Sequence, residues 1–267
     1  MQEAGASAIV RRVPPATREP RARDSPACRP EHARPRPFPE PRGLPGMLRV
    51  SKAHDAGSGI MLTYFTPVYA RTMPRAARTN AALRRLVLDR EQTTPGEDKS
   101  NVGGWHSAPD LFSSQAPEVR ELLDWVCAAV LAMSKYMSQT PHKGTQIETR
   151  GWANVSRNGD YHRAHMHPGH DWSGIYYVDP GEHPAAYPDS GIIEFHDPRC
   201  AVGILETPGK PFWGTVHFRP EAGMLLLFPS WLVHTVNPYR GERERISIAF
   251  NVRMVSPTPG TPGVGPP

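Results

Sequence analysis

The chain has few cysteines and no long apolar run. Its 267 residues include only Cys28, Cys127 and Cys200, an odd number without a C-x-x-C pair. This pattern argues against a disulfide framework or a structural zinc site and fits a reducing compartment. No apolar stretch is long enough to span a membrane, and the N-terminus lacks the apolar centre of a secretory signal. We therefore expect a cytoplasmic protein without a membrane partner, in which Cys127 is an ordinary core residue.

The basic charge of the chain lies in its N-terminal segment. Residues 1–60 hold eleven of the 31 basic residues and six of the 26 acidic residues. The remainder therefore has 20 residues of each sign, 31 − 11 and 26 − 6, and no net charge. Tight binding to nucleic acid usually needs a basic surface on the folded domain. We do not expect nucleic acid as a partner.

Composition divides the chain into three parts. Residues 1–60 form a Pro/Arg-rich tract without periodicity, which cannot bury enough apolar area to offset the entropy of ordering, so we expect disorder. This tract is either a basic arm or targeting peptide, or an extension upstream of a true start at Met47 or Met61. Residues 61–254 are expected to form the folded domain, and residues 255–267 a second disordered tail.

Within the domain, a helical part precedes a β-rich part. Residues 61–72 have the β-branched and aromatic content of a strand, while residues 79–92 and 114–139 have apolar residues at helical spacing. From about residue 146 onward, roughly eight short strand-like runs alternate with Gly, Pro, Asp and Asn. This order predicts a mainly β fold, a sandwich or jelly roll braced by N-terminal helices.

Three histidines suggest a metal site. His165 and His167 are two residues apart, so on a strand their side chains would point the same way. Paired imidazoles are poor core residues but suit two neighbouring positions on iron, zinc, copper or nickel. His234, which follows an apolar strand, is the candidate third ligand. The alternative is that they are surface or hydrogen-bonded histidines, as most histidines are.

An arginine and a serine suggest an anion site near this metal. Arg245 and Ser247 share one face of the strand-like run RISIAFNV. A guanidinium beside a hydroxyl can hold a carboxylate through charge-assisted hydrogen bonds. The alternative is a salt bridge from Arg245 to an acidic residue at the rim of the fold.

The spacing of these residues resembles the C-terminal signature of the Fe(II)/2-oxoglutarate-dependent oxygenases, which have a distal His followed by Arg-x-Ser. Residues 61–252 resemble more closely a bacterial and phage family of 2-oxoglutarate-Fe(II) oxygenases. The stretches that carry the resemblance are YFTPVY (64–69), SNVGGWHS (100–107), HMHPGHDWSGIYYV (165–178), FHDPR (195–199) and LLLFPSWLVHTVNPYRGERERISIAFN (225–251).

The resemblance implies a double-stranded β-helix that uses Fe(II) and 2-oxoglutarate. His165 and His234 would be iron ligands, and Arg245 with Ser247 would bind the distal carboxylate of 2-oxoglutarate. The implied activity is that of a dioxygenase hydroxylating an unknown small-molecule or peptide substrate, with release of succinate and CO2. Trp172, Tyr176 and Tyr177, which follow the metal strand, would either line the pocket or pack in the sheet. We expect packing for at least one of the two tyrosines, because neighbouring residues of a strand face opposite ways.

One position departs from the usual pattern. The common triad has Asp or Glu two residues after the first His, and this chain has His167 there. We expect His167 to be the third ligand, which leaves the iron one negative charge short. A carboxylate from elsewhere, with Asp171 nearest, or a water or halide are the alternatives.

Two other classes of protein remain open. A cupin shares the β-helix, and its first motif begins like Gly159, five residues, then His165-x-His167; however, Trp231 stands where its second motif has glycine. A cupin would also have no need of Arg245 and Ser247. The other class is a metal-stabilised, non-enzymatic jelly roll that binds a carbohydrate or protein. Many β-helix proteins associate through sheet edges or helices, so a homodimer is also left open.

Overall fold

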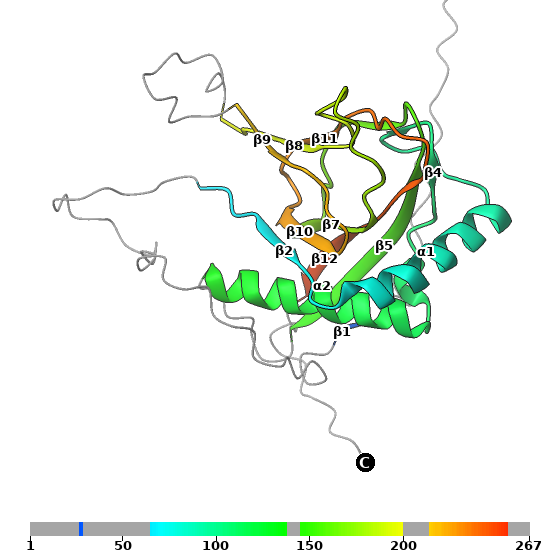
Figure 1. Cartoon of the computed structure of the whole chain (residues 1–267). Helices are drawn as coiled ribbons and strands as arrows, with labels where there is room; N and C mark the ends of the chain where they lie inside the picture. Colours follow the sequence, from blue (N-terminus) through cyan, green and yellow to red (C-terminus); the bar gives the residue numbers. More distant parts are fainter. Residues whose placement is uncertain (1–26, 29–64, 138–144, 200–213, 256–267) are drawn as a thin grey trace, which may run out of the picture.

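The computed structural model describes residues 27–28, 65–137, 145–199 and 214–255. Two antiparallel sheets face each other, and two helices cover the outer face of the larger one (Figure 1). The tail at 256–267 and most of residues 1–60 lie outside the described residues. Within that N-terminal tract, only β1 (Ala27–Cys28) is described, and it pairs with β5.

The larger sheet has seven strands in the order β1-β5-β12-β7-β10-β2, with β4 added beside β5. The bounds are β5 Gln146–Ser156, β12 Arg245–Val255, β7 Trp172–Asp179, β10 Met224–Pro229, β2 Tyr69–Thr72 and β4 Trp105–His106. The smaller sheet has the order β3-β6-β11-β8-β9. Its bounds are β3 Asn101–Val102, β6 Tyr161–His165, β11 His234–Val236, β8 Ile193–His196 and β9 Thr215–Phe218.

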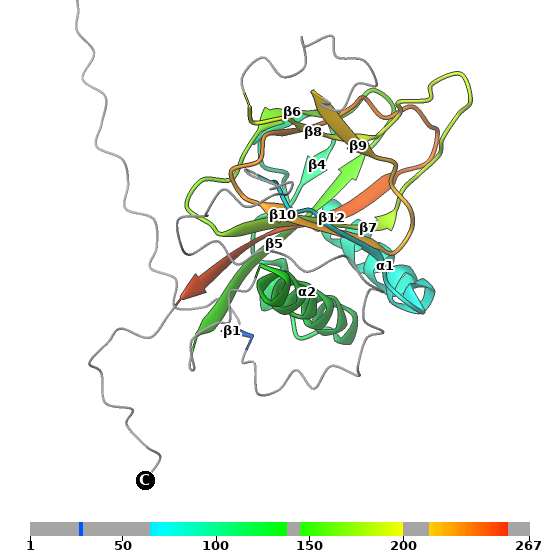
Figure 2. The same ribbon diagram turned by 90° about the vertical axis from the view of Figure 1, so that its left-hand side faces the viewer.

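This order makes the fold a double-stranded β-helix, as predicted. The chain crosses repeatedly from one sheet to the other, so that β5, β7, β10 and β12 lie in the larger sheet and β6, β8, β9 and β11 in the smaller one. Figure 2 shows the smaller sheet facing the larger one on the side away from the helices. Residues at the start of β11 and the end of β6 therefore meet, although 69 positions separate His165 from His234.

The helices are α1 (Ala76–Thr93) and α2 (Pro117–Tyr136), with a short 3-10 turn, η1 (Leu111–Ser113), between them. They confirm the helical spacing in the sequence, although α1 begins earlier and α2 later than expected. The start of α2 is set by Pro117, whose fixed φ and missing N–H suit the first helical position. Residues 138–139, included in the expected second helix, lie outside the described residues.

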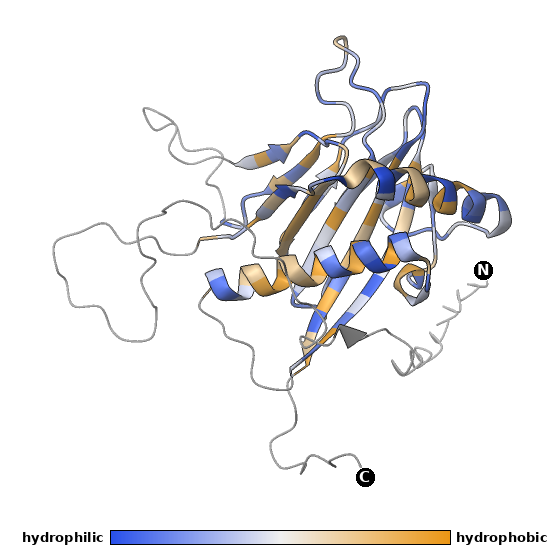
Figure 3. Cartoon of the chain, turned by 60° about the horizontal axis from the view of Figure 1, so that its bottom comes forward, coloured by the Kyte–Doolittle hydropathy of each residue, from blue (hydrophilic) through white to orange (hydrophobic). Residues whose placement is uncertain are grey.

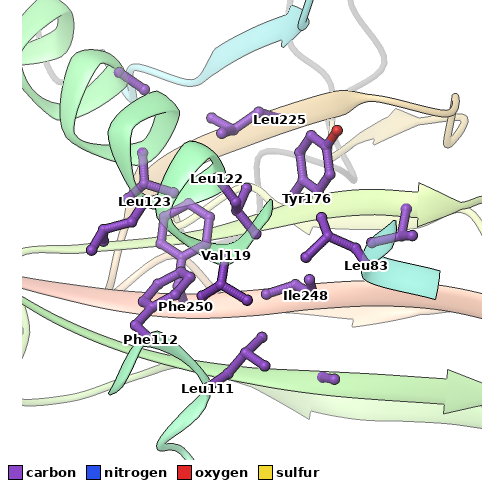
Figure 4. Packing of buried hydrophobic residues seen from close by; sticks show 14 of the residues in the cluster. Leu83, Leu111, Phe112, Val119, Leu122, Leu123, Tyr176, Leu225, Ile248 and Phe250 are labelled. Atoms are coloured by element: carbon purple, nitrogen blue, oxygen red, sulfur yellow. The ribbon is translucent and has the colours of Figure 1, made fainter. Parts of the chain in front are cut away.

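The main core lies between the helices and the larger sheet. Figure 4 shows Leu122 and Val119 of α2 beside Phe250 and Ile248 of β12. Figure 3 shows hydrophobic and hydrophilic positions alternating along α2, and the buried apolar ones belong to this core. Because strand side chains alternate, the apolar residues of β12 face the helices, and Arg245 and Ser247 face the smaller sheet.

One cysteine corrects an expectation. Cys127 of α2 is buried, as predicted, but it is disulfide-bonded rather than an ordinary core residue. Residue spacing could not reveal this bond, because it depends on which distant segments meet. No helix in the described part of the chain is both long and apolar enough to cross a membrane.

Candidate metal centre and anion pocket

Three histidines converge where the two sheets meet. His165, His167 and His234 each offer a nitrogen atom, and these atoms lie within 4.8 Å of one another. The rings of His165 and His234 are 4.2 Å apart between centroids, and their residues are register partners in the β6–β11 pair. Three nitrogens at this separation can bind one metal ion on one side and leave further positions open.

Backbone hydrogen bonds orient two of these imidazoles. Nδ1 of His165 donates to the carbonyl of Arg163 at 2.7 Å, and Nδ1 of His234 donates to the carbonyl of Leu232 at 2.9 Å. A carbonyl only accepts, so Nδ1 carries the proton and Nε2 has the free lone pair. Nε2 of His165 also lies 3.3 Å from the hydroxyl of Ser100. Hydrogen bonds of this kind commonly fix the tautomer of a metal-binding histidine.

His167 differs from its two neighbours in its support. It lies beyond the end of β6, so its convergence with His165 does not come from strand alternation, which corrects that part of the sequence argument. Its backbone N–H donates to the backbone carbonyl of Ser230 at 2.9 Å. Asp171, the alternative ligand, instead accepts a 2.6 Å hydrogen bond from the backbone of Met254 and is not part of the converging group.

Burial keeps these histidines neutral. It lowers the pKa of His234 and of the neighbouring His162 to about 3 and that of His167 to about 4, with nearby imidazoles adding to the effect for His167. Burial also lowers the pKa of His165. A neutral imidazole is the form that binds a metal, so the site is ready to bind at neutral pH.

The metal-free protein should lose stability as the pH falls below about 6.5, where histidines of an unfolded chain take up protons. In the folded protein His162, His167 and His234 have pKa values of about 3 to 4. Between about pH 6.5 and pH 4 the unfolded state therefore binds more protons than the folded state, and acid favours unfolding. Urea unfolding of the protein after a chelator has removed any metal would measure the free energy of unfolding at several pH values between 7 and 4.5. His162→Gln should reduce the slope, and a free energy of unfolding that does not change over this range would contradict the prediction.

Arg245 lies in the same cavity without an acidic partner. The side chain is 1% exposed, donates one 3.3 Å hydrogen bond to the carbonyl of Gly191, and has no partner for Nε among the described residues. Its guanidinium carbon is 5.3 Å from the ring centre of Tyr177. The rim salt bridge considered as an alternative is therefore absent from this part of the chain. A buried guanidinium without a carboxylate favours an anionic ligand.

The cavity also contains residues that no sequence motif marks. His162, Asn154 and Trp152 line it together with the three histidines, Arg245 and Ser247. The Asn154 side-chain oxygen and the Tyr177 hydroxyl are buried and have no hydrogen-bond partner among the residues that the structure describes. Burial raises the pKa of Tyr177 to about 12, so its hydroxyl stays protonated and can donate. Tyr176 packs on the helix side, where its hydroxyl donates to Asn80 at 2.5 Å, whereas Tyr177 lies between the sheets beside Arg245, as strand alternation predicts.

A second, wider cleft lies next to the metal centre. Phe195, on its wall, is the register partner of His234, and the ring centroids of these two residues are 6.1 Å apart. The acidic and basic residues in this cleft, Asp197 and Arg199, form an ion pair at 2.6 Å. Its apolar lining consists of Phe65, Val68, Phe195, Val216, Phe218 and Leu232.

Comparison with known proteins finds one family model and several solved structures to which the chain is similar. Residues 150–251 match the family model described as "Putative 2OG-Fe(II) oxygenase". The chain is also similar to the crystal structure of a prolyl-4-hydroxylase from Pseudomonas putida, at 19% identity and a TM-score of 0.50. That alignment covers 72% of this chain and 93% of the other. It supports the fold.

Two further solved structures are similar. A prolyl hydroxylase from Trichoplax adhaerens, in complex with a hypoxia inducible factor peptide fragment, has 13% identity and a TM-score of 0.49. The alignment covers 72% of this chain and 84% of that one. HygX from Streptomyces hygroscopicus, with nickel and 2-oxoglutarate bound, has 13% identity and a TM-score of 0.46, covering 70% and 83%. No curated protein sequence matches the chain.

Proposed function

We propose that this chain, whose residues 150–251 match the 2OG-Fe(II) oxygenase family model, hydroxylates its substrate with iron held by His165, His167 and His234. The observation that carries the proposal is one cavity lined by three converging imidazoles and a buried guanidinium that has no carboxylate partner among the described residues. Fe(II) with 2-oxoglutarate activates dioxygen to oxidise a C–H bond, with succinate and CO2 as the other products.

The residues of the cavity fit both groups. The imidazoles are neutral at pH 7 and two are fixed by carbonyls, so they present lone pairs to a metal without a proton to displace. Arg245 would bind the distal carboxylate of 2-oxoglutarate, and Ser247 on the same strand face would add a hydroxyl donor. Tyr177, protonated and beside the Arg245 guanidinium, would donate to the same carboxylate.

The cleft beside the metal is proposed to admit the substrate. Its described lining is largely apolar, and the opposite charges of Asp197 and Arg199 in it pair with each other. A neutral, apolar portion of a small molecule or peptide would therefore be favoured over a highly charged one. A homodimer and a cytoplasmic location stay predictions.

The test is anaerobic addition of Fe(II) and 2-oxoglutarate to the full chain. We expect a visible charge-transfer band that requires both components, because the keto acid must bind the metal for the band to arise. Admission of oxygen should then convert 2-oxoglutarate to succinate, and with a true substrate the product should gain one oxygen atom from O2, measured by mass spectrometry. Iron that binds without any band on adding 2-oxoglutarate would instead favour the cupin alternative.

A further inference from the structure

The three histidines are not equally supported by the protein. His165 and His234 each donate Nδ1–H to a carbonyl two residues earlier. The His167 imidazole makes no hydrogen bond within the described parts of the chain, and it lies outside regular structure after β6. A metal-binding imidazole without such a bond needs another means of holding its ring orientation.

The His167 ring contacts those of His165 and His234, 5.0 Å and 5.3 Å away between centroids, and it also contacts an aromatic ring outside the metal group. The indole of Trp152 lies 5.8 Å from the His167 ring, and His106 stacks on Trp152 at 5.6 Å and 19°. His106 is itself fixed, because its Nδ1 donates to the carbonyl of Ser107 at 2.8 Å. The three rings thus form a row that ends at the candidate metal centre.

The row stands on a rigid part of the sheet. Trp152 is in β5, which pairs with β12 from Gln146 to Ser156 and with β4 at His106 itself. Trp152 is 9% exposed and points into the cavity, while its neighbour Ala153 faces the helices. A large planar side chain fixed in the middle of a sheet can restrict the rotation of a ring that lies on it.

We propose that Trp152, backed by His106, is a positioning residue that orients His167 toward the metal in place of the hydrogen bond that orients His165 and His234. This inference rests on the proposed metal site. It concerns the position at which the chain departs from the usual carboxylate. Aromatic packing replaces hydrogen bonding there, and the third ligand depends on the shape of the cavity wall.

Cobalt binding to the full chain tests this role without 2-oxoglutarate. Co(II) reports ligand number and geometry through its visible absorption, and titration gives the affinity. Trp152→Ala should weaken Co(II) binding about tenfold and shift the spectrum toward that of His167→Ala. Trp152→Phe, which keeps an aromatic face, should restore both. Trp125→Ala removes an indole that contacts Tyr176 on the helix side, and should leave the cobalt spectrum unchanged.

The decisive comparison uses the His167→Ala background. If Trp152 acts through His167, Trp152→Ala should cause no further loss of affinity in that background. Equal losses in both backgrounds, or a Trp152→Ala protein that binds Co(II) like wild type, would overturn the inference and leave the proposed function intact. Co(II) binding that follows the expected pattern, without a 2-oxoglutarate band with Fe(II), would instead refute the proposed function alone.

Discussion

Arg245→Met is expected to stabilise the ligand-free protein and to remove its response to 2-oxoglutarate. The guanidinium is fully buried with an unsatisfied Nε, and burial lowers its pKa. Replacing a buried charge by an apolar side chain of similar volume often stabilises by about 1–4 kcal/mol. Losing the charged partner of a buried carboxylate should weaken 2-oxoglutarate binding by about 2–5 kcal/mol, roughly 30-fold to 4,000-fold.

Thermal unfolding with and without 2-oxoglutarate measures both effects in one experiment. Zn(II) can replace iron, so that no reaction consumes the ligand, and binding then appears as a rise in Tm. Arg253→Met, an exposed position on the same strand, should change neither quantity. A variant that is still protected by 2-oxoglutarate as strongly as wild type would show that Arg245 does not bind it.

His234→Ala should abolish stable metal binding. This residue is 4% exposed, is held by the carbonyl of Leu232, and is paired in register with His165. Its removal leaves two imidazoles, of which only that of His165 is fixed by a hydrogen bond. We expect the retained Fe(II), measured by metal analysis after anaerobic desalting, to fall to background.

His217→Ala is the matched control, because His217 is exposed on β9 outside the converging group. It should retain iron as wild type does. His167→Ala should weaken binding less than His234→Ala, since its ring has less support from the backbone. If His234→Ala kept its iron, the metal centre would have to be sought elsewhere in the chain.

Much of the fold and site follows from patterns of short period. Alternation in RISIAFNV places Arg245 and Ser247 on the face opposite Ile246 and Ile248, as the structure has them. Apolar spacing in residues 114–139 predicts α2, because a helix brings every third or fourth side chain to one face. Such patterns depend only on local geometry, and so a single sequence reveals them.

Features that depend on distant segments could not be predicted in the same way. His162 and Asn154 line the cavity only because β6 lies beside β11 and β5 beside β12. Nothing near them in sequence distinguishes them from ordinary polar strand residues. Strand alternation predicts that His167 points the same way as His165, yet the strand ends at His165 and the loop after it positions the His167 ring. The bond of Cys127 likewise depends on tertiary contacts.

The position of β12 has a consequence for the synthesis of the protein. This strand is the last one in the described part of the chain but lies in the middle of the larger sheet, between β5 and β7. While residues 245–255 are still inside the ribosome, the growing chain has a gap between those two strands. It also lacks the guanidinium of Arg245 that would bind a carboxylate. The cosubstrate pocket therefore forms late, and a nascent chain cannot retain 2-oxoglutarate until its C-terminal strand has emerged and closed the sheet.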